Sequence, residues 1–298
     1  IFQAVPWGLP IWLTPPKHGD VRVANVQLAR AFYYLDPVNG SDAYDGSCPA
    51  DQADPAHGKG PWRTLTYVGT NTVVNNDRRT VLYCAPGTYA EGSRNGARAY
   101  IQNNGGRMLH FVATEGPEKT FIVGATDPDT NGLGPKALRI LKSDNAIASG
   151  FVGFTLTQGY TDTATAAWAS MIASAAYGLL DVVESVVSNN FAAEGIDYGG
   201  VRFDRCLIAD NTSKLILNGG IYRGCVLRDN HANAGGYYGW IYSGSAMNCL
   251  FYLTPGVSGG DILATTGSKA YNSVFVNAER LLQAAEVRGC LLDNCSGD

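Results

Sequence analysis

A short pattern of apolar and polar residues occurs twice between residues 199 and 233. Residues 202–211 read RFDRCLIADN, and residues 221–230 read IYRGCVLRDN. In both copies a Cys is followed by two aliphatic residues, one further residue and Asp-Asn. The two cysteines, Cys206 and Cys225, are 19 residues apart. Looser copies carry a Cys or Ser at the same point of the pattern, and these residues are Ser185, Cys249, Ser273 and Cys290.

The spacing of the copies predicts a solenoid. Successive copies are 21, 19, 24, 24 and 17 residues apart, which fits coils that keep one strand while their loops vary. Each copy is too short for a helix, is rich in β-branched and aliphatic residues, and has Gly, Asn and Asp around it. Each therefore predicts a strand followed by a turn. One strand in about twenty residues indicates a parallel β-coil.

Equivalent positions of such a coil lie above one another at a spacing of ~4.8 Å. The Cys and Ser positions would form a column of small side chains in a narrow interior. Five residues later, Asn190, Asn211 and Asn230 would form a second column. Stacked amides at a bend can hydrogen-bond along the column and satisfy backbone groups of the turn. The pattern therefore predicts an asparagine ladder.

The Cys/Ser column, the asparagine ladder and the aliphatic pair resemble the right-handed parallel β-helix proteins of the pectate lyase type. The resemblance implies an all-β fold, a right-handed parallel β-helix with an N-terminal capping helix. We expect residues 31–298 to form a single domain of about eight to ten coils of about twenty residues. The fold hosts lyases, hydrolases, epimerases and adhesins, so it does not define the activity.

The N-terminal part of this domain carries a second resemblance. Residues 32–46 read FYYLDPVNGSDAYDG, residues 61–65 read PWRTL, and residues 85–89 read APGTY. This order is similar to the opening of many exported bacterial β-helix proteins, and it implies a secreted or cell-surface protein. It also implies a helix from Pro61 to about Asn75 that caps the first coil. An open coil end would otherwise expose strand edges and core.

Residues 1–30 are expected to form an apolar arm ahead of the domain. The first 13 residues contain Trp7 and Trp12 but no Met and no basic segment, so they are not an intact signal peptide, and prolines break any membrane helix. Because side chains alternate along a strand, one of the two aliphatic columns must face outward. Such an apolar stripe needs a cover, and we expect the arm or a partner subunit to lie on it. The oligomeric state stays open.

Composition narrows the alternatives. With 298 residues, 45% of them hydrophobic, the chain can bury a large core, and 36 glycines favour turns and strands over helices. A net charge of −4 gives no reason to expect a nucleic acid partner. Seven cysteines leave at least one unpaired. The column cysteines are expected to be buried thiols, whereas Cys48 with Cys84, or Cys290 with Cys295, could close disulfides in an exported protein.

Two groups of carboxylates are candidates for calcium. The turn that contains Asp36, Asp42 and Asp45 has either ordinary turn chemistry or a calcium site. Asp210 and Asp229 occupy equivalent positions one coil apart, where they repel each other unless a cation or base lies between them. A set of surface salt bridges is one interpretation of this second group, and a calcium site is the other.

Lys214, Arg223 and Arg228 are the basic residues nearest to this carboxylate pair in the predicted coils. The resemblance implies that lyases of this fold use a Lys or Arg to take the proton alpha to a carboxylate, often with calcium. The three residues are therefore candidate catalytic residues. Basic residues also occur on any surface strand, so the spacing alone does not establish catalysis.

An aromatic segment, YYGWIY at residues 237–242, is a candidate carbohydrate site. Alternation along a strand places Tyr238, Trp240 and Tyr242 on one face, and sugar rings stack on flat aromatic faces. Packing of the same residues in the core or in a loop is the alternative. The sequence as a whole favours a protein that binds or cleaves a polysaccharide or cell-surface glycan. A uronate-type polysaccharide lyase is one form of this function. A non-catalytic adhesin or stalk is the alternative.

Overall fold

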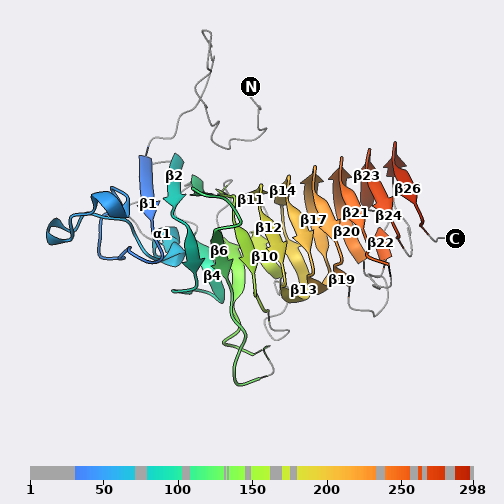
Figure 1. The fold of residues 1–298 in the computed structure, drawn as a ribbon. Helices are drawn as coiled ribbons and strands as arrows, with labels where there is room; N and C mark the ends of the chain where they lie inside the picture. The colour runs from blue at the N-terminus through green and yellow to red at the C-terminus, as the bar shows by residue number, and fades with distance from the viewer. Residues whose placement is uncertain are drawn as a thin grey trace, which may run out of the picture.

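The protein is a parallel β-helix, in which three all-parallel sheets run along the length of the molecule (Figure 1). The computed structural model describes residues 31–70, 79–102, 108–130, 132, 134–144, 149–161, 170–174, 180–232, 239–255, 261–263, 267–278 and 286–295. The expected N-terminal arm, residues 1–30, lies outside these ranges. All strand pairs that join neighbouring coils within the sheets are parallel, as the repeat predicts.

The three sheets are numbered here in the order in which the chain enters them. Sheet 1 runs in the order β1 (Ala31–Leu35), β2 (Arg79–Cys84), β5 (Met108–Ala113), β8 (Ser149–Val152), β11 (Leu180–Val183), β14 (Val201–Asp204), β17 (Leu217–Arg223), β20 (Gly239–Met247), β23 (Ser268–Tyr271) and β25 (Glu286–Arg288), with β22 (Asp261–Leu263) paired to β20. Sheet 2 contains β3 (Gly87–Tyr89), β6 (Thr120–Val123), β9 (Thr155–Thr157), β12 (Val186–Ser188), β15 (Leu207–Ala209), β18 (Val226–Arg228), β21 (Leu250–Tyr252), β24 (Val274–Val276) and β26 (Leu291–Asp293). Sheet 3 contains β4 (Ala97–Ile101), β7 (Arg139–Ser143), β10 (Ser170–Ser174), β13 (Phe191–Tyr198), β16 (Thr212–Leu215) and β19 (His231–Ala232).

The register of sheet 2 confirms the predicted columns. Val186 pairs with Leu207, Leu207 with Val226 and Val226 with Leu250. One residue earlier, the amide of Val226 donates to the carbonyl of Cys206 at 2.9 Å, and the amide of Leu250 donates to that of Cys225 at the same distance. Cys206 and Cys225 therefore occupy the same point on consecutive coils, and their side chains are buried as predicted.

The asparagine ladder is also confirmed. The side-chain amide of Asn190 donates to Oδ1 of Asn211 at 2.9 Å, and that of Asn211 donates to Oδ1 of Asn230 at 3.0 Å. Each Nδ2 also reaches a backbone carbonyl of the preceding coil, for example Val187 from Asn211 at 2.8 Å. The three side chains are buried. Their hydrogen bonds satisfy backbone groups that the tight bend leaves without a strand partner.

Left-handed residues mark both ends of the short strands in sheet 2. A residue with φ between 46° and 64° directly precedes the Cys/Ser column in six coils, namely Glu184, Arg205, Gly224, Asn248, Asn272 and Gly289, and Gly153, with φ of 77°, precedes Phe154 at the equivalent position. A second residue with φ between 48° and 56° follows the strand in six coils, namely Gln158, Asn189, Asp210, Asp229, Asn277 and Asn294. Gly and Asn adopt this conformation most readily, which explains their frequency at these two corners.

The inward face of sheet 2 fills the core. The second aliphatic position of each copy points inward, and Val187, Ile208 and Leu227 are fully buried there. Aromatic rings continue this column, since Phe251 and Phe275 stack with centroids 4.6 Å apart. The first aliphatic position faces outward and is half-buried from Val186 to Val274. The outward stripe is thus the first column, while its proposed cover, the N-terminal arm, lies outside the described residues.

Only part of the segment that was expected to form the capping helix is described. The helix begins at Leu65 and ends at Thr70 (α1), and residues 71–78 are outside the described ranges, so a capping role is not shown. The long loop before α1, with the short helical turns η1 (Ala50–Gln52) and η2 (Pro55–His57), instead contacts the free edge of β1. Tyr34 N donates to Gly46 O at 3.0 Å, and Trp62 N donates to Tyr34 O at 2.9 Å. This loop therefore satisfies backbone groups of an otherwise open strand edge.

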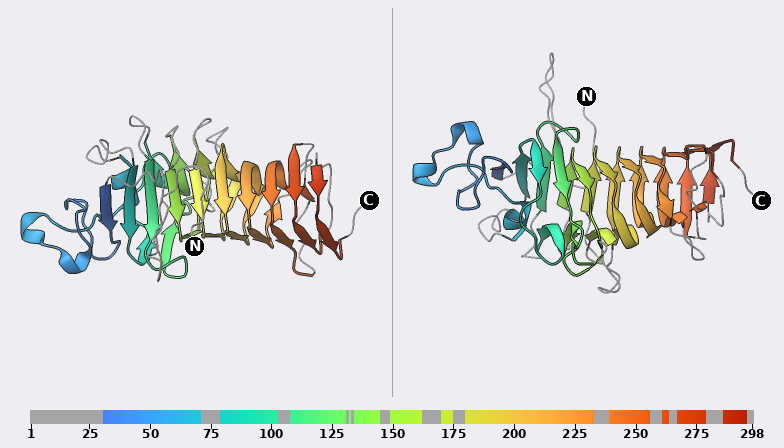
Figure 2. Two further views of the ribbon diagram at one scale, coloured as in Figure 1. Left: turned by 90° about the horizontal axis from the view of Figure 1, so that it is seen from above. Right: turned by 60° about the horizontal axis from the view of Figure 1, so that its bottom comes forward.

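Figure 2 shows this loop, in blue, at the end of the molecule opposite the C-terminus.

All seven cysteines are free thiols, so neither of the two considered disulfides is present. Among the residues that the structure describes, no helix has the length and hydropathy needed to cross a membrane.

Candidate functional site

The carboxylate pair proposed for calcium forms salt bridges instead. Nη2 of Arg228 lies 3.5 Å from Oδ2 of Asp210, and its Nε lies 3.6 Å from Oδ2 of Asp229. Asp229 also accepts hydrogen bonds from the backbone N and Oγ1 of Thr254, at 2.7 and 2.8 Å. The guanidinium thus supplies the positive charge that the pair requires. The salt-bridge interpretation therefore describes these contacts, and no cluster of three or more His, Cys, Asp or Glu suited to a metal occurs within the described ranges.

The three candidate catalytic residues do not come together. Lys214 lies on β16 of sheet 3, Arg223 on β17 of sheet 1 and Arg228 on β18 of sheet 2. Nζ of Lys214 is 3.2 Å from Oε2 of Glu194, in an exposed ion pair. A proton-abstracting site needs its base and its charge-stabilising groups around one substrate atom. The structure places this set on different faces of the coil, so it does not support the sequence hypothesis.

The predicted aromatic face does not exist at Trp240. This side chain is 0% exposed and packs beside Phe251, with ring centroids 6.4 Å apart, whereas Tyr242 is 37% exposed. Trp240 and its neighbour Ile241 are both buried in the core, so strict alternation does not hold at the start of β20. The core alternative is therefore correct for Trp240, and Tyr238 lies outside the described residues.

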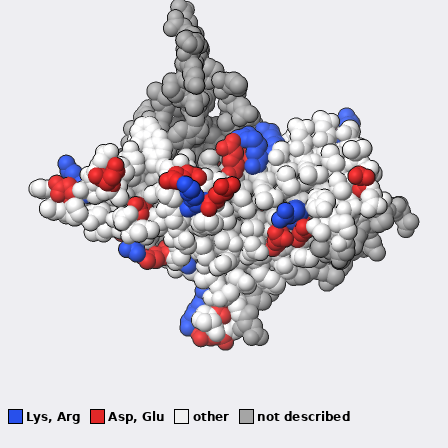
Figure 3. Space-filling model, in the orientation of Figure 1, with Lys and Arg blue, Asp and Glu red and all other residues white. Residues whose placement is uncertain are grey.

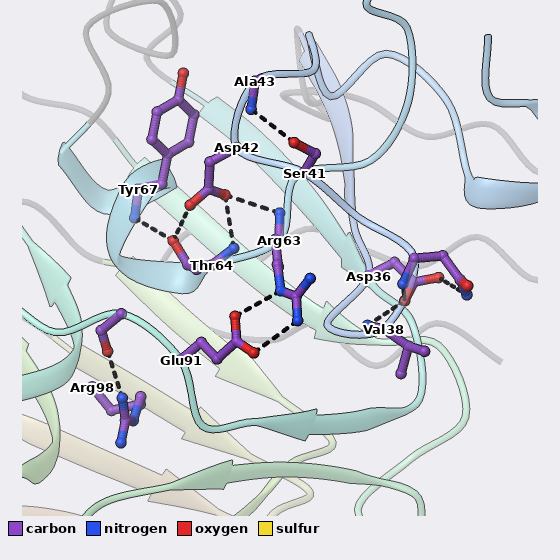
Figure 4. Close-up of polar contacts among 12 residues, drawn as sticks. Asp36, Val38, Ser41, Asp42, Ala43, Arg63, Thr64, Tyr67, Glu91 and Arg98 are labelled. Carbon is purple, nitrogen blue, oxygen red and sulfur yellow. Dashed lines mark hydrogen bonds and ion pairs between the residues drawn. The ribbon is translucent and has the colours of Figure 1, made fainter. Parts of the chain in front are cut away.

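The acidic turn near the N-terminus has the chemistry of a turn (Figure 4). Asp36 Oδ1 accepts from the amides of Val38 and Asn39 at 2.8 and 2.9 Å. Asp42 accepts from the amides of Arg63 and Thr64, at 3.0 and 2.9 Å, and thereby fixes the residues that precede α1.

Asp45 belongs to the same turn. It accepts from Ser47 N at 2.9 Å, and hydrogen bonding with Ser47 lowers the pKa of the Asp45 carboxyl. The carboxylates of this segment are thus bound by the protein's own N–H groups, as the turn interpretation predicts.

A pocket opens where this loop meets the first strands of sheet 1. It has a volume of about 400 Å³. Its lining consists of strand residues, residues just beyond strand ends and loop residues: Tyr34, Leu35, Asp36, Pro49, Ala50, Pro61, Tyr83, Ala85 and Thr114. The C-terminal ends of β1, β2 and β5 thus form one wall, and the loop before α1 forms the other.

Alternation along the strands directs two tyrosines into this pocket. Tyr34 pairs with Tyr83 in the β1–β2 register, and their neighbours Leu35 and Leu82 point into the core. The tyrosine rings therefore lie on the outer face of sheet 1, with centroids 5.7 Å apart and planes inclined by 31°. Phe32, which is 50% exposed, stacks on Tyr83 at 6.0 Å and 9°. Three aromatic rings thus form a continuous outer surface beside the pocket.

The loop wall is held firmly against these strands. Trp62 is fully buried, stacks on Tyr33 at 4.8 Å, and donates from Nε1 to the carbonyl of Tyr44 at 2.7 Å. Asp36 N donates to the carbonyl of Trp62 at 2.8 Å. The loop side of the lining consists of small or rigid residues, which leave space in front of the rings: Pro49, Ala50 and Pro61. The pocket is therefore formed before any ligand arrives.

The polar groups of the pocket are mainly hydroxyls. Tyr34, Tyr83 and Thr114 carry them, and the Thr114 hydroxyl already donates to the carbonyl of Cys84 at 3.2 Å, which leaves its oxygen as an acceptor. Burial raises the pKa of Tyr83, and the neighbouring Tyr34 adds to the rise. Tyr83 therefore remains protonated at neutral pH. The remaining lining is largely apolar, a composition typical of sites for small molecules.

The sequence hypotheses did not include this pocket. They used the aromatic residues of the opening segment only to identify a strand and a turn. Alternation between inward Tyr33 and outward Tyr34 would have placed Tyr34 outside. The pairing of Tyr34 with Tyr83 could not be read from the repeat, because the repeat begins downstream of β1 and β2.

A buried ion pair lies farther along the outer face of sheet 1. Arg202 donates from Nε and Nη2 to the two oxygens of Asp181, at 2.5 and 2.7 Å. Burial raises the pKa of Asp181 to about 6, although the Arg202 guanidinium opposes that rise. At neutral pH the two groups form a bidentate pair that needs no further ion.

No family model matches this chain, and no curated protein matches it. Among solved structures, the chain has a distant similarity to a pectin methylesterase mutant in complex with a hexasaccharide, with a TM-score of 0.43 and 12% identity over 82% of this chain and 78% of that one. It has a similar likeness to a rhamnogalacturonan lyase, with a TM-score of 0.40 and 15% identity over 84% of this chain and 75% of that one. The parallel β-helix fold itself rests on the strand register described above.

Proposed function

We propose that this protein binds a polysaccharide or cell-surface glycan and holds part of it in the pocket between the Tyr34 and Tyr83 rings and the loop before α1. The observation that carries the proposal is the pair of outward tyrosine rings beside a preformed pocket of about 400 Å³. This volume falls within the range of roughly 300–1,000 Å³ that is usual for small-molecule sites. A secreted or cell-surface location is part of the proposal and rests on the likeness of residues 31–92 to exported β-helix proteins.

The chemistry of the pocket matches that of a sugar. One side of a pyranose ring presents C–H groups that pack on an aromatic face, while its rim carries hydroxyls. The Tyr34 and Tyr83 rings offer such faces, and the hydroxyls of Tyr83 and Thr114 offer partners for the rim. Exposed Phe32 extends the aromatic surface beyond the pocket, so a glycan could continue along the outer face of sheet 1.

Cleavage of the glycan is not part of the proposal. The residues considered for catalysis, Lys214, Arg223 and Arg228, lie on three different sheets. Calcium is not part of the proposal either, since Arg228 already forms ion pairs with Asp210 and Asp229.

Calorimetric titration of the wild type and of Tyr34→Ala with a panel of oligosaccharides tests this function. Loss of one stacking ring should weaken binding about tenfold, equivalent to roughly 1.4 kcal/mol. Tyr252→Ala is the matched control, since Tyr252 is a half-buried tyrosine on the outer side of β21 in sheet 2. It should bind like the wild type.

The melting temperature of each variant establishes that it is folded. The proposal fails if no glycan of the panel binds the wild type. It also fails if folded Tyr34→Ala binds as tightly as the Tyr252→Ala control.

A further inference from the structure

We infer that the pocket selects uncharged sugars and discriminates against uronates. This inference rests on the proposed function and names the class of its ligand. It differs from the sequence expectation, which considered uronate polymers because of basic residues elsewhere on the coil. The inference comes from the kinds of side chain that line the pocket and from the charge of the one ionisable acid among them.

No Lys, Arg or His is among the lining residues, all of which belong to the described part of the chain. Proteins recognise sugar carboxylates through cationic or strong N–H donors, above all the paired donors of Arg. The pocket walls instead carry the neutral hydroxyls of Tyr34, Tyr83 and Thr114, of which that of Thr114 already donates to the Cys84 carbonyl. A uronate would therefore lose the hydration of its carboxylate without gaining a charged partner.

Basic residues near the loop wall do not change this balance. Lys59 and Arg63 flank Pro61 in sequence, but neither lines the pocket. Arg63 is held by Glu91, with Nε 2.7 Å from Oε2 and Nη2 2.7 Å from Oε1. Its charge is thus already compensated. Elsewhere, on the face drawn in Figure 3, acidic and basic side chains form small mixed groups separated by uncharged surface.

The acid in the lining adds repulsion. Asp36 is 7% exposed, and its oxygens accept from the amides of Val38 and Asn39 and from the side chain of Asn39, at 2.8, 2.9 and 3.1 Å. These donors hold the carboxylate in a fixed position beside the pocket. A second carboxylate on the sugar would meet a like charge with no cation between them, which lowers the affinity of the wrong ligand.

A matched pair of ligands tests the inference. Oligogalacturonate and its fully methyl-esterified form have the same rings and linkages and differ in charge, and neutral gluco- and galacto-oligosaccharides of the same length complete the panel. At pH 7 and low salt, we expect the ester to bind the wild type at least tenfold more tightly than the free acid. Added salt should narrow this difference, because it screens the repulsion from Asp36.

The Tyr34→Ala variant shows whether the measured binding occurs in the pocket. It should bind the ester more weakly than the wild type does, and its affinities for the ester and the free acid should differ less. Equal or tighter binding of the free acid would overturn the inference and leave the proposed function standing. Failure of every sugar to bind would overturn the proposed function itself.

Discussion

Asp197 is a carboxylic acid enclosed in the interior of the coil. It is 0% exposed, and it accepts hydrogen bonds from Asn218 N at 2.6 Å and from the Tyr222 hydroxyl at 3.0 Å. Tyr222 is equally buried and accepts from Gly220 N at 3.0 Å. Burial raises the pKa of Asp197 to about 7, while the two donors oppose the rise. The folded protein therefore holds this group neutral over much of the acidic range.

This residue predicts a dependence of stability on pH. In the unfolded chain the carboxyl ionises near its ordinary pKa of 3.8, whereas in the fold it ionises only near 7. Its contribution is therefore complete below about pH 4 and is lost as the pH rises through 7. Each pKa unit is worth ~1.4 kcal/mol. Asp197→Asn, which stays neutral, should flatten the profile of unfolding free energy measured in urea between pH 4 and pH 8.

Asp210→Asn is the control for that measurement, because it removes one carboxylate at a half-exposed corner. Its profile should follow that of the wild type. If the unfolding free energies of the wild type and of Asp197→Asn change with pH by the same amount between pH 4 and pH 8, the account of Asp197 is contradicted.

Sequence reasoning at this scale succeeded where side chains repeat and failed where they do not. Cys206, Cys225 and the three ladder asparagines could be placed because stacking gives each position the same surroundings in every coil. For Trp240 the sequence left both a surface and a core position open, because two consecutive buried residues, Trp240 and Ile241, do not follow strand alternation. Asp197 carried no signal either, because an Asp next to apolar residues is usually exposed.

The short strands of sheet 2 depend on the left-handed corners at both ends. Each corner turns the chain from one sheet to the next, and together the two corners set the strand length at about three residues. Several corners carry residues for which this conformation is unfavourable, such as Glu184, Arg205 and Gln158. The repeated hydrogen bonds between coils hold these residues in place.

Gly224 tests the role of the corners. A Cβ added there would lie 3.6 Å from Cγ of Arg205, an ordinary contact, so the effect of a side chain is conformational. Gly224→Ala should lower the free energy of unfolding by about 1 kcal/mol. Gly224→Asn should cost much less, because Asn248 and Asn272 hold the same corner in other coils. Chemical denaturation measures both, and an alanine variant as stable as the wild type would refute the argument.

At the scale of elements, the repeat predicted parallel strands and their order, but not the first coil. The PWRTL segment predicts a helix from Pro61, whereas α1 begins four residues later, at Leu65. The contacts of the preceding loop with β1 were not foreseen, because they depend on the burial of Trp62 and on backbone bonds between residues distant in sequence. Local patterns indicate where a helix starts, whereas tertiary contacts determine what covers a strand edge.

The molecule as a whole combines a regular coil with an irregular first turn, and the candidate site belongs to the irregular part. The pocket joins the ends of β1, β2 and β5 to the loop around Pro49 and Pro61. Tyr83, Ala85 and Thr114, at the ends of β2 and β5, extend the lining onto the coils that follow β1. A glycan bound here would lie at the end of the coil that carries the loop, opposite the C-terminus.

A crystal structure of the protein with a neutral oligosaccharide tests this account most directly. We predict that a sugar ring lies against the faces of Tyr34 and Tyr83, with its hydroxyls in reach of Thr114. A sugar bound instead beside Tyr242, or at the corner formed by Asp210 and Arg228, with the tyrosine pocket empty, would contradict it.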